Sequence, residues 1–474
     1  MINLKTLTIQ SVHDSLLKGE FTVRELVDAY LEQIKQKNAD INAYLSIYKS
    51  LDEMVLRAQK MIDDGSANIM TGIPVAMKDN MVMKGEYSSA GSLILEHFIG
   101  VTDATVTQKL KDAGAVLIGR TNMDDGAMGS STETSAYGIT RNPLNTDYVP
   151  GGSSGGPAAA IAMDGALVAL GSDTGGSIRQ PAGYCGLVGF KPTYGEVSRS
   201  GIIAMASSLD QVGPMAKNVA DAEILFNMIR GADEMDETSI PQNIARDTRA
   251  IKKIGIPTKW IEQGGIEASV KKNFDETLEK LQQAGFEIIS IDLPITQYSL
   301  SVYYVLNTAE VSSNLARYDG IRYGLSEKGT NLQEVYEKTR GVGFGKEVRR
   351  RILLGAYILS HGYYDAYYKK ALDVQNAIQA ELKDVFNLSN GGVDVIMTPT
   401  APFLPFKFGE KMNDPIAMKL SDLFLAPANI AGNPALSIPS GDAENNLKHS
   451  THFLAPTLAD DSLLSFGKEI EKLL

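Results

Sequence analysis

Cysteine is almost absent from this sequence, and its scarcity excludes several kinds of site. Cys185 is the only cysteine among 474 residues. A single cysteine can form neither a disulfide within the chain nor a metal site built from several thiolates. We therefore expect Cys185 to be a buried structural thiol, and we expect the chemistry of this chain to use no metal.

Long apolar runs are missing as well. Nowhere do 18 apolar residues follow one another, so we expect no membrane-spanning helix. The first twenty residues lack both the apolar core of a secretory signal and the arginine- and serine-rich, acid-poor composition of a transit peptide. These features predict a soluble protein that resides in the cytoplasm.

Positive charge is in deficit. The chain carries 45 lysines and arginines against 57 aspartates and glutamates, which gives a net charge of −12. A protein that binds a nucleic-acid backbone replaces condensed counterions with lysine and arginine, and an acidic chain is poorly suited to this. If the function involves a nucleic acid, we expect a partner protein to hold it.

The sequence does contain the alternation that is typical of an α/β protein. Short apolar runs between glycine-rich turns suit strands that are buried on both faces, and they lie at 72–79, 113–122, 165–174 and 185–193. Helical patterns lie between or beside them, and Thr22 with Glu25 forms a capping box in front of the first long one. We predict a mixed, mostly parallel central sheet covered by helices on both faces.

No internal repeat, low-complexity tract or long linker divides the chain, so we predict one domain over residues 1–474. Its expected parts are an N-terminal helical part, a core with the candidate catalytic residues, a helix-rich part on the substrate side, and C-terminal strands with a final helix. These parts cover 1–65, 66–230, 231–400 and 401–474. The polar stretch 231–250 is predicted to be a surface excursion.

Two glycine–serine segments are the most informative feature, PGGSSGGP at 150–157 and GSDTGGSIRQPAG at 171–183. Glycine beside serine lets backbone N–H groups approach a ligand closely and permits positive φ. The amides of Thr174, Gly175, Gly176 and Ser177 could form a concave cluster of donors. Such a cluster suits the oxyanion that forms during acyl transfer.

Other interpretations of glycine–serine segments are weaker here. One such segment alone is usually a flexible loop, but two segments between strand and helix patterns favour a site. A phosphate-binding P-loop requires Gly-Lys-Ser/Thr, and neither segment contains a lysine. The glycines at 341–345 lie in a helical, arginine-rich region without a preceding strand, so we interpret them as turn structure.

A nucleophilic serine needs a base. No histidine lies in the two segments and no GxSxG motif surrounds either serine, although folding could bring one of five histidines close: His13, His97, His361, His449 or His452. Lys78 is the other candidate, because it ends the apolar run at 72–79 and burial would lower its pKa. Taken alone, Lys78 is better explained as a surface residue paired with Asp79, so these patterns leave the base open.

The blocks GIPVAMKDN, PGGSSGG and GSDTGGSIRQPA resemble, in order and spacing, those of the amidase signature family. Lys78 and Ser153 are 75 positions apart, and Ser153 and Ser177 are 24 apart. The resemblance implies the amidase signature fold, with Ser177 as nucleophile, Ser153 in a cis peptide bond as proton relay, and Lys78 as terminal base. It also implies an oxyanion hole made by the amides of residues 174–177.

Further blocks resemble one branch of that family, the glutamine-hydrolysing subunits of the glutamyl-tRNA(Gln) and aspartyl-tRNA(Asn) amidotransferases. Among them are the blocks at 308–324 and 344–370, which general amidases do not usually carry. This resemblance implies that free glutamine is the substrate, with its carboxylate on Arg351, its ammonium on Asp422 and Tyr303 helping to orient it. Tyr304 and Arg350 remain the adjacent alternatives.

The same resemblance implies partners. Ammonia would pass to a B subunit, which holds the mischarged tRNA and uses ATP and Mg²⁺ to amidate it, and a small C subunit would join the two in a heterotrimer. This chain itself would bind no cofactor. The alternatives are a free-standing amidase acting on another small amide and a scaffold subunit. The presence of Lys78, Ser153 and Ser177 disfavours the scaffold.

The sequence departs from that branch at three places. Pro157 stands where a small residue is usual, Asp125–Gly126 replaces the commoner Glu-Phe, and the tail after Ser440 lacks the Gly-Leu-Pro-Val-Gly-Leu-Gln stretch. The last departure puts the final strand and its contacts in doubt. None of the three touches Lys78, Ser153 or Ser177.

Overall fold

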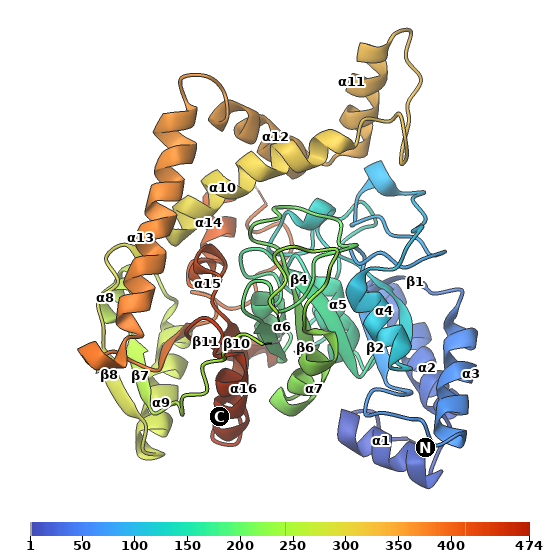
Figure 1. Ribbon diagram of the computed structural model, residues 1–474, viewed down its shortest axis with the longest axis horizontal. Coiled ribbons are helices and arrows are strands. Elements are labelled where there is room, and N and C mark those ends of the chain that lie inside the picture. Colours follow the sequence, from blue (N-terminus) through green and yellow to red (C-terminus); the bar gives the residue numbers. More distant parts are fainter. Residues whose placement is uncertain (1, 242, 413) are drawn as a thin grey trace.

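One sheet of eleven strands forms the centre of the computed structural model, which describes residues 2–241, 243–412 and 414–474 (Figure 1). Its strand order is β1-β3-β2-β4-β6-β5-β10-β11-β9-β7-β8. The strands are β1 (Tyr44–Ile47), β2 (Pro74–Lys78), β3 (Val116–Thr121), β4 (Val168–Asp173), β5 (Val188–Lys191), β6 (Gln211–Ala216), β7 (Lys253–Ile256), β8 (Glu287–Ser290), β9 (Val395–Pro399), β10 (Ala435–Asp442) and β11 (Lys448–Leu454).

The sheet is mixed, as predicted, but parallel pairs do not predominate. Among the described residues, β2 pairs in parallel with β3 and β4, and β7 pairs in parallel with β8 and β9. The six other pairings are antiparallel and include all those of β5, β6, β10 and β11. The expectation of a mostly parallel sheet was wrong, because an apolar run indicates that a strand is buried but not whether it runs parallel or antiparallel to its neighbours.

Helices cover this sheet and account for the burial of its strands. Every residue of β2, β3, β4 and β6 is buried, which requires cover on both faces of the sheet, as predicted. The helices are α1 (Ile9–Lys18), α2 (Val23–Ile41), α3 (Leu51–Asp63), α4 (Thr105–Asp112), α5 (Gly155–Ala162), α6 (Arg179–Tyr184), α7 (Val219–Ile229), α8 (Thr258–Gln263), α9 (Ala268–Gln283), α10 (Ser299–Asn314), α11 (Leu332–Gly343), α12 (Lys346–Ile358), α13 (Lys370–Val385), α14 (Pro415–Leu420), α15 (Ala426–Ala431) and α16 (Asp460–Ile470).

Local sequence signals explain several boundaries. Thr22 caps α2, and its side chain and that of Glu25 form the predicted capping box. Pro157 lies in the first turn of α5, where a missing N–H is tolerated. The described residues of 231–250 form only turns, bends and irregular backbone, which confirms the surface excursion. No helix of the described chain is both long enough and apolar enough to cross a membrane.

The C-terminal departure does not remove the last strand. β11 pairs with β10 on one side and with β9 on the other, so the tail completes the sheet. Cys185 is buried after α6, as predicted. The division of one domain into four parts stays a prediction.

A group of helices stands beside the sheet and approaches the glycine–serine segments. In Figure 1, α10, α12 and α13 lie together above and beside the sheet, with α11 at their far end. α10 packs against α12, α13 and α15. This packing brings residues 299–358 to the edge of the sheet where β2 and β4 end.

Candidate active site

Lys78 is the centre of the site. It is the last residue of β2 and is fully buried, and its ammonium contacts three serine side chains. Its Nζ lies 2.9 Å from Ser153 Oγ, 2.7 Å from Ser154 Oγ and 2.9 Å from Ser172 Oγ. The alternative of a surface lysine paired with Asp79 was wrong, because Asp79 pairs with Arg120 instead.

Burial lowers the pKa of Lys78 to about 7, against the opposing effect of the carboxylates of Asp124, Asp173 and Asp210. A neutral amine therefore exists at ordinary pH, with two N–H donors and one lone pair. Ser154 donates its own proton to Ser172 O at 3.1 Å, so Ser154 Oγ accepts from Nζ. Ser172 Oγ, 2.9 Å away, can accept the second N–H, with Ser172 O at 3.2 Å, and this leaves the lone pair for the Ser153 hydroxyl.

Ser153 is held by its backbone. The peptide bond between Gly152 and Ser153 is cis, as the resemblance implied. On one side Gly152 N–H donates to Gln180 Oε1 at 2.8 Å, and on the other Ser153 O accepts from Asp124 N at 3.3 Å. These bonds fix the Ser153 side chain toward Lys78 just before α5 begins.

Ser177 lies in the loop that follows β4. Its carbonyl accepts from Ser154 N at 3.2 Å, so the two serine segments are adjacent. The Asp173 carboxylate spans the loop by accepting Gly176 N at 2.8 Å and Ile178 N at 3.1 Å. The Ser177 hydroxyl makes no hydrogen bond with a described residue, and 9% of the residue is exposed.

The loop amides divide into engaged and open donors. Gly176 N–H is bonded to Asp173, whereas those of Thr174, Gly175 and Ser177 donate to no residue in the described ranges. Gly176 has φ of +135°, and a Cβ there would lie 2.6 Å from Leu425 Cδ1. Only glycine fits this position. Because Gly176 N–H is already bonded to Asp173, three of the four expected amides remain open to an oxyanion.

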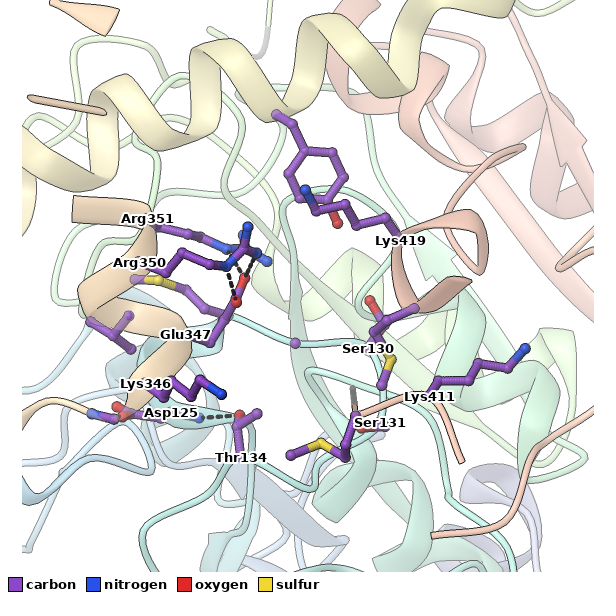
Figure 2. Close-up of a pocket in the computed structure, with 17 residues that line it drawn as sticks. Asp125, Ser130, Ser131, Thr134, Lys346, Glu347, Arg350, Arg351, Lys411 and Lys419 are labelled. Carbon is purple, nitrogen blue, oxygen red and sulfur yellow. Dashed lines mark hydrogen bonds and ion pairs between the residues drawn. The ribbon is translucent and has the colours of Figure 1, made fainter. Parts of the chain in front are cut away.

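Of the residues expected to hold glutamine, Arg351 lines a cavity, whereas Tyr303 and Asp422 do not line it, and neither does Ser177. This cavity of about 360 Å³ is lined by Ser130, Ser131, Tyr304 and Arg351 (Figure 2). Asp422 lies behind Ser130, whose hydroxyl donates to Asp422 Oδ2 at 2.7 Å.

Tyr303 packs on the nucleophile loop rather than lining this cavity. A Cβ built on Gly175 would lie 2.7 Å from Tyr303 Cζ, so the ring covers that glycine closely. Its neighbour Tyr304 faces the cavity. Both tyrosines of the alternative pair are therefore at the site, on different sides of α10.

Two of the three arginines of α12, Arg350 and Arg351, share one carboxylate. Glu347 accepts from Arg351 Nε at 2.8 Å and from Arg350 through two bonds of 2.8 and 2.7 Å (Figure 2). Arg351 is buried and also donates to Asn307 Oδ1 at 2.9 Å, whereas Arg350 is half-buried. The burial favours Arg351 as the residue fixed for a ligand.

Asp422 is the second group with a shifted pKa at this place. Burial raises the pKa of its carboxyl to about 7, and the Ser130 hydroxyl and Arg351 oppose this shift. A cation that entered the cavity beside it would favour the ionised form.

A histidine base, left open by the sequence, has no support in the geometry. Among the described residues, no histidine side chain forms a hydrogen bond with Ser153 or Ser177. His452 Nε2 contacts Arg179 Nη1 rather than a serine.

Several residues that hold the candidate site residues in place were not predicted from the sequence. Ser154 and Ser172 surround Lys78, Gln180 fixes Gly152, and Glu347 fixes Arg351. Ser154 had a signal, since it adjoins Ser153 in the segment. Ser172 and Gln180 gave none, because their partners lie 94 and 28 positions away in the sequence. Glu347 did have a signal, because it lies four positions before Arg351 on one helix.

Asp125, one of the departures, also lies in the cavity wall. Its Oδ2 accepts from Gly345 N at 2.8 Å, at the residue that precedes α12. Burial raises the pKa of Asp125 to about 6. Asp125 therefore connects the segment that follows β3 to the start of α12.

Comparison with known proteins places this geometry in a family. The family model described as Amidase matches residues 25–464. Proteins named as the A subunit of glutamyl-tRNA(Gln) amidotransferase are similar to this chain: that of Thermodesulfovibrio yellowstonii is 44% identical, and that of Syntrophus aciditrophicus 45%, each over 99% of this chain and 98% of the relative. The crystal structure of the protein with this name from Thermotoga maritima has a TM-score of 0.81 and 39% identity, over 100% of this chain and 96% of that one. The chain belongs to the amidase family.

Proposed function

We propose that this chain is the glutamine-hydrolysing subunit of a glutamyl-tRNA(Gln) amidotransferase. The proposal rests on a sequence identity of 44–45% to proteins named as such subunits, over nearly the whole of both chains. The contact of a fully buried Lys78 with Ser153 supports the chemistry, because a lysine with a lowered pKa can serve as a base.

In the first half of the reaction, Ser177 Oγ attacks the side-chain amide carbon of glutamine. The Ser177 proton passes to Ser153 Oγ, and the Ser153 proton passes to neutral Lys78. The amides of Thr174, Gly175 and Ser177 stabilise the oxyanion. The tetrahedral intermediate collapses when the C–N bond breaks, the nitrogen takes the proton back through Ser153, and ammonia leaves a glutamyl ester on Ser177.

In the second half, water attacks the ester carbon. Its proton follows the same route to Lys78, the ester C–O bond breaks, and the proton returns to Ser177. Glutamate leaves and the three residues regain their starting protonation. One relay serves both halves because water enters where ammonia left and gives up its proton along the path by which ammonia gained one.

The α-groups of glutamine determine where the amide is placed. Arg351 pairs with the carboxylate, since a guanidinium matches a carboxylate through two parallel hydrogen bonds. Asp422 takes the ammonium, and Tyr303 orients the ligand over the nucleophile loop. The burial of Arg351 and Asp422 and the cavity beside them support these roles.

The ammonia then goes to a partner. A B subunit, which uses ATP and Mg²⁺, amidates the glutamate on mischarged tRNA, and a small C subunit completes a heterotrimer. This chain binds no cofactor of its own in this scheme, and the complex works in the cytoplasm. The net charge of −12 supports a partner as the holder of tRNA.

Ammonia release from glutamine tests the proposal. The chain is purified with and without co-expressed B and C subunits, as wild type, Ser177→Ala and the exposed control Ser66→Ala. We expect glutamine hydrolysis by wild type and control, none by Ser177→Ala, and survival of ATP-dependent glutamate activation in the Ser177→Ala complex.

Two outcomes would contradict it. Turnover of many small amides, with indifference to glutamine, partners and tRNA, would make the chain a free-standing amidase. Activity in Ser177→Ala would remove Ser177 from the nucleophile's role.

A further inference from the structure

His452 is a buried histidine whose two ring nitrogens both have partners. It lies in the middle of β11 and is 1% exposed. Its Nε2 is 2.9 Å from Arg179 Nη1, and its Nδ1 is 3.2 Å from Thr398 Oγ1 on β9. A guanidinium can only donate, so Nε2 must carry a lone pair and the ring proton must sit on Nδ1. The contacts therefore define one neutral tautomer.

Arg179 uses its full set of donors in this position. Nε and one Nη2 proton bind the two oxygens of Asp173, each at 3.0 Å. The other Nη2 proton goes to Asn429 Oδ1 at 2.8 Å. The two Nη1 protons go to Leu425 O at 3.0 Å and to His452. Loss of His452 would leave one buried N–H of a fully buried cation without an acceptor.

Asp173 transmits the position of Arg179 to the nucleophile loop. Its Oδ1 accepts Gly176 N and its Oδ2 accepts Ile178 N, on either side of Ser177. A continuous chain of bonds therefore runs from Thr398 and His452, through Arg179 and Asp173, to the loop that carries Ser177. No sequence pattern indicated it, because His452 lies 273 positions beyond Arg179.

We propose that His452 is a positioning residue for the nucleophile loop, in which its unprotonated Nε2 holds Arg179 against Asp173 and thereby fixes residues 174–177. The inference rests on the proposed role of Ser177 as nucleophile. His452 touches neither substrate nor reacting atoms, and it acts through the Arg179–Asp173 pair alone.

The charges around His452 keep it neutral. Arg179 on α6 and Lys191 on β5 oppose its protonation as cations, and Asp173 at the end of β4 is the opposing anion. Burial lowers the pKa of Lys191 to about 7, so Lys191 is fully charged only below that pH. Thr398 on β9 and Ser437 on β10, its neighbours in the sheet, are uncharged. Burial and the two cations lower the pKa of His452 well below its usual value. A protonated ring would place two cations 2.9 Å apart and break the bond to Arg179.

Two substitutions of similar size separate positioning from packing. His452→Gln keeps a neutral acceptor that can reach Arg179, whereas His452→Leu fills the space without one. Glutamine hydrolysis is measured in the full amidotransferase complex. We expect His452→Leu to lower kcat at least tenfold, since the loop holds the oxyanion donors. We expect its KM for glutamine to change less than kcat, because Arg351 lies on α12, outside the chain of bonds that starts at His452. His452→Gln should keep kcat within threefold of wild type.

A His452→Leu enzyme with wild-type kcat, or a His452→Gln enzyme as impaired as His452→Leu, would overturn the proposal. Ser177→Ala run in parallel separates this failure from failure of the proposed function, because activity in Ser177→Ala contradicts the nucleophile whatever His452 does.

Thermal unfolding of the full chain against pH gives a second test, which can contradict the proposal even if His452→Leu does not fold. The unfolded histidine binds a proton below about pH 6.5 and the folded one does not. The wild type should therefore lose stability as pH falls below that value, by up to about tenfold per pH unit in the unfolding equilibrium constant relative to His452→Gln. Parallel pH curves for the two proteins would show that His452 is not held neutral, and would overturn the proposal.

Discussion

Lys78 shows how one buried residue is prepared for proton transfer. An isolated buried ammonium is strongly disfavoured, and here burial lowers its pKa to about 7. Three serines accept or offer hydrogen bonds around it, so the neutral amine that remains after the ammonium loses its proton still has hydrogen-bond partners. The strand end supplies the burial and the serine segments supply the partners. A base poised near neutral pH results.

The pH dependence of glutamine hydrolysis should reveal two groups in the free enzyme. Lys78 and Asp422 both have pKa values of about 7, and both must lose a proton, Lys78 to act as base and Asp422 to hold an ammonium. The logarithm of kcat/KM should therefore rise with pH below 7 with a slope above one. The logarithm of kcat should rise with a slope of one, because bound glutamine already keeps Asp422 ionised.

Asp422→Asn provides the check on this assignment. It should raise KM and reduce the slope of kcat/KM to one, while the kcat profile keeps its shape. A kcat that falls as pH rises through 7 would be incompatible with neutral Lys78 as the base.

Adjacent serines should differ sharply in importance. Ser153→Ala should lower kcat about a thousandfold or more, because it interrupts the relay. Ser154→Ala removes one acceptor of the Lys78 N–H groups, which costs about 1–3 kcal/mol for a buried donor and predicts a loss of about five- to a hundredfold. Steady-state ammonia release measures both, and equal losses would show that the geometry around Nζ has been misassigned.

At the scale of elements, the crossing of α10 and α12 determines where the glutamine-binding residues stand. Gly355 makes this crossing possible, because a Cβ there would lie 1.9 Å from Thr308 O and would clash with the backbone of α10. α10 carries Tyr303 and α12 carries Arg351, so their separation sets the width of the site.

Gly355→Ala should therefore force the two helices apart. We expect a rise in KM for glutamine of tenfold or more with a smaller change in kcat, and a loss of stability of about 1–3 kcal/mol, the usual cost of overpacking. Gly341→Ala in α11 is the matched control, because nothing lies within 4 Å of its Cβ and alanine is the better helix former. If Gly355→Ala left KM unchanged, α12 would not set the position of Arg351.

Local elements were the part of the fold that sequence could predict. The capping box of Thr22 and Glu25 and the buried runs at 72–79 and 165–174 all became the expected helix and strands. Their signals depend on neighbours within a few residues. The direction of the strands and the bonds of Gln180 and His452 depend on partners far along the chain, and one sequence does not encode these as a local pattern. The bond between Glu347 and Arg351 spans four positions of one helix, a spacing that predicts a pair. Lys78, Ser153 and Ser177 were located because a resemblance supplied that long-range information.

At the scale of the whole molecule, the acidic net charge predicts that the chain does not bind tRNA by itself. With a net charge of −12, the chain alone should not retain tRNA at about 150 mM salt, where binding depends on released counterions. The complex with B and C subunits should retain it. A gel-retardation or filter-binding assay with mischarged tRNA compares the two, and tight binding by the isolated chain would contradict the expectation.

The order of the chain through the site has an evolutionary consequence. Under the proposed function, bond-breaking groups come from residues 78–177, whereas the groups assigned to the α-end of the substrate come from 303–422. Mutations that remodel the second stretch leave the first one intact. Selection for a new amide can therefore proceed without rebuilding the reaction, and a chain of this design is a starting point from which substrate range diversifies while the hydrolytic step is inherited unchanged.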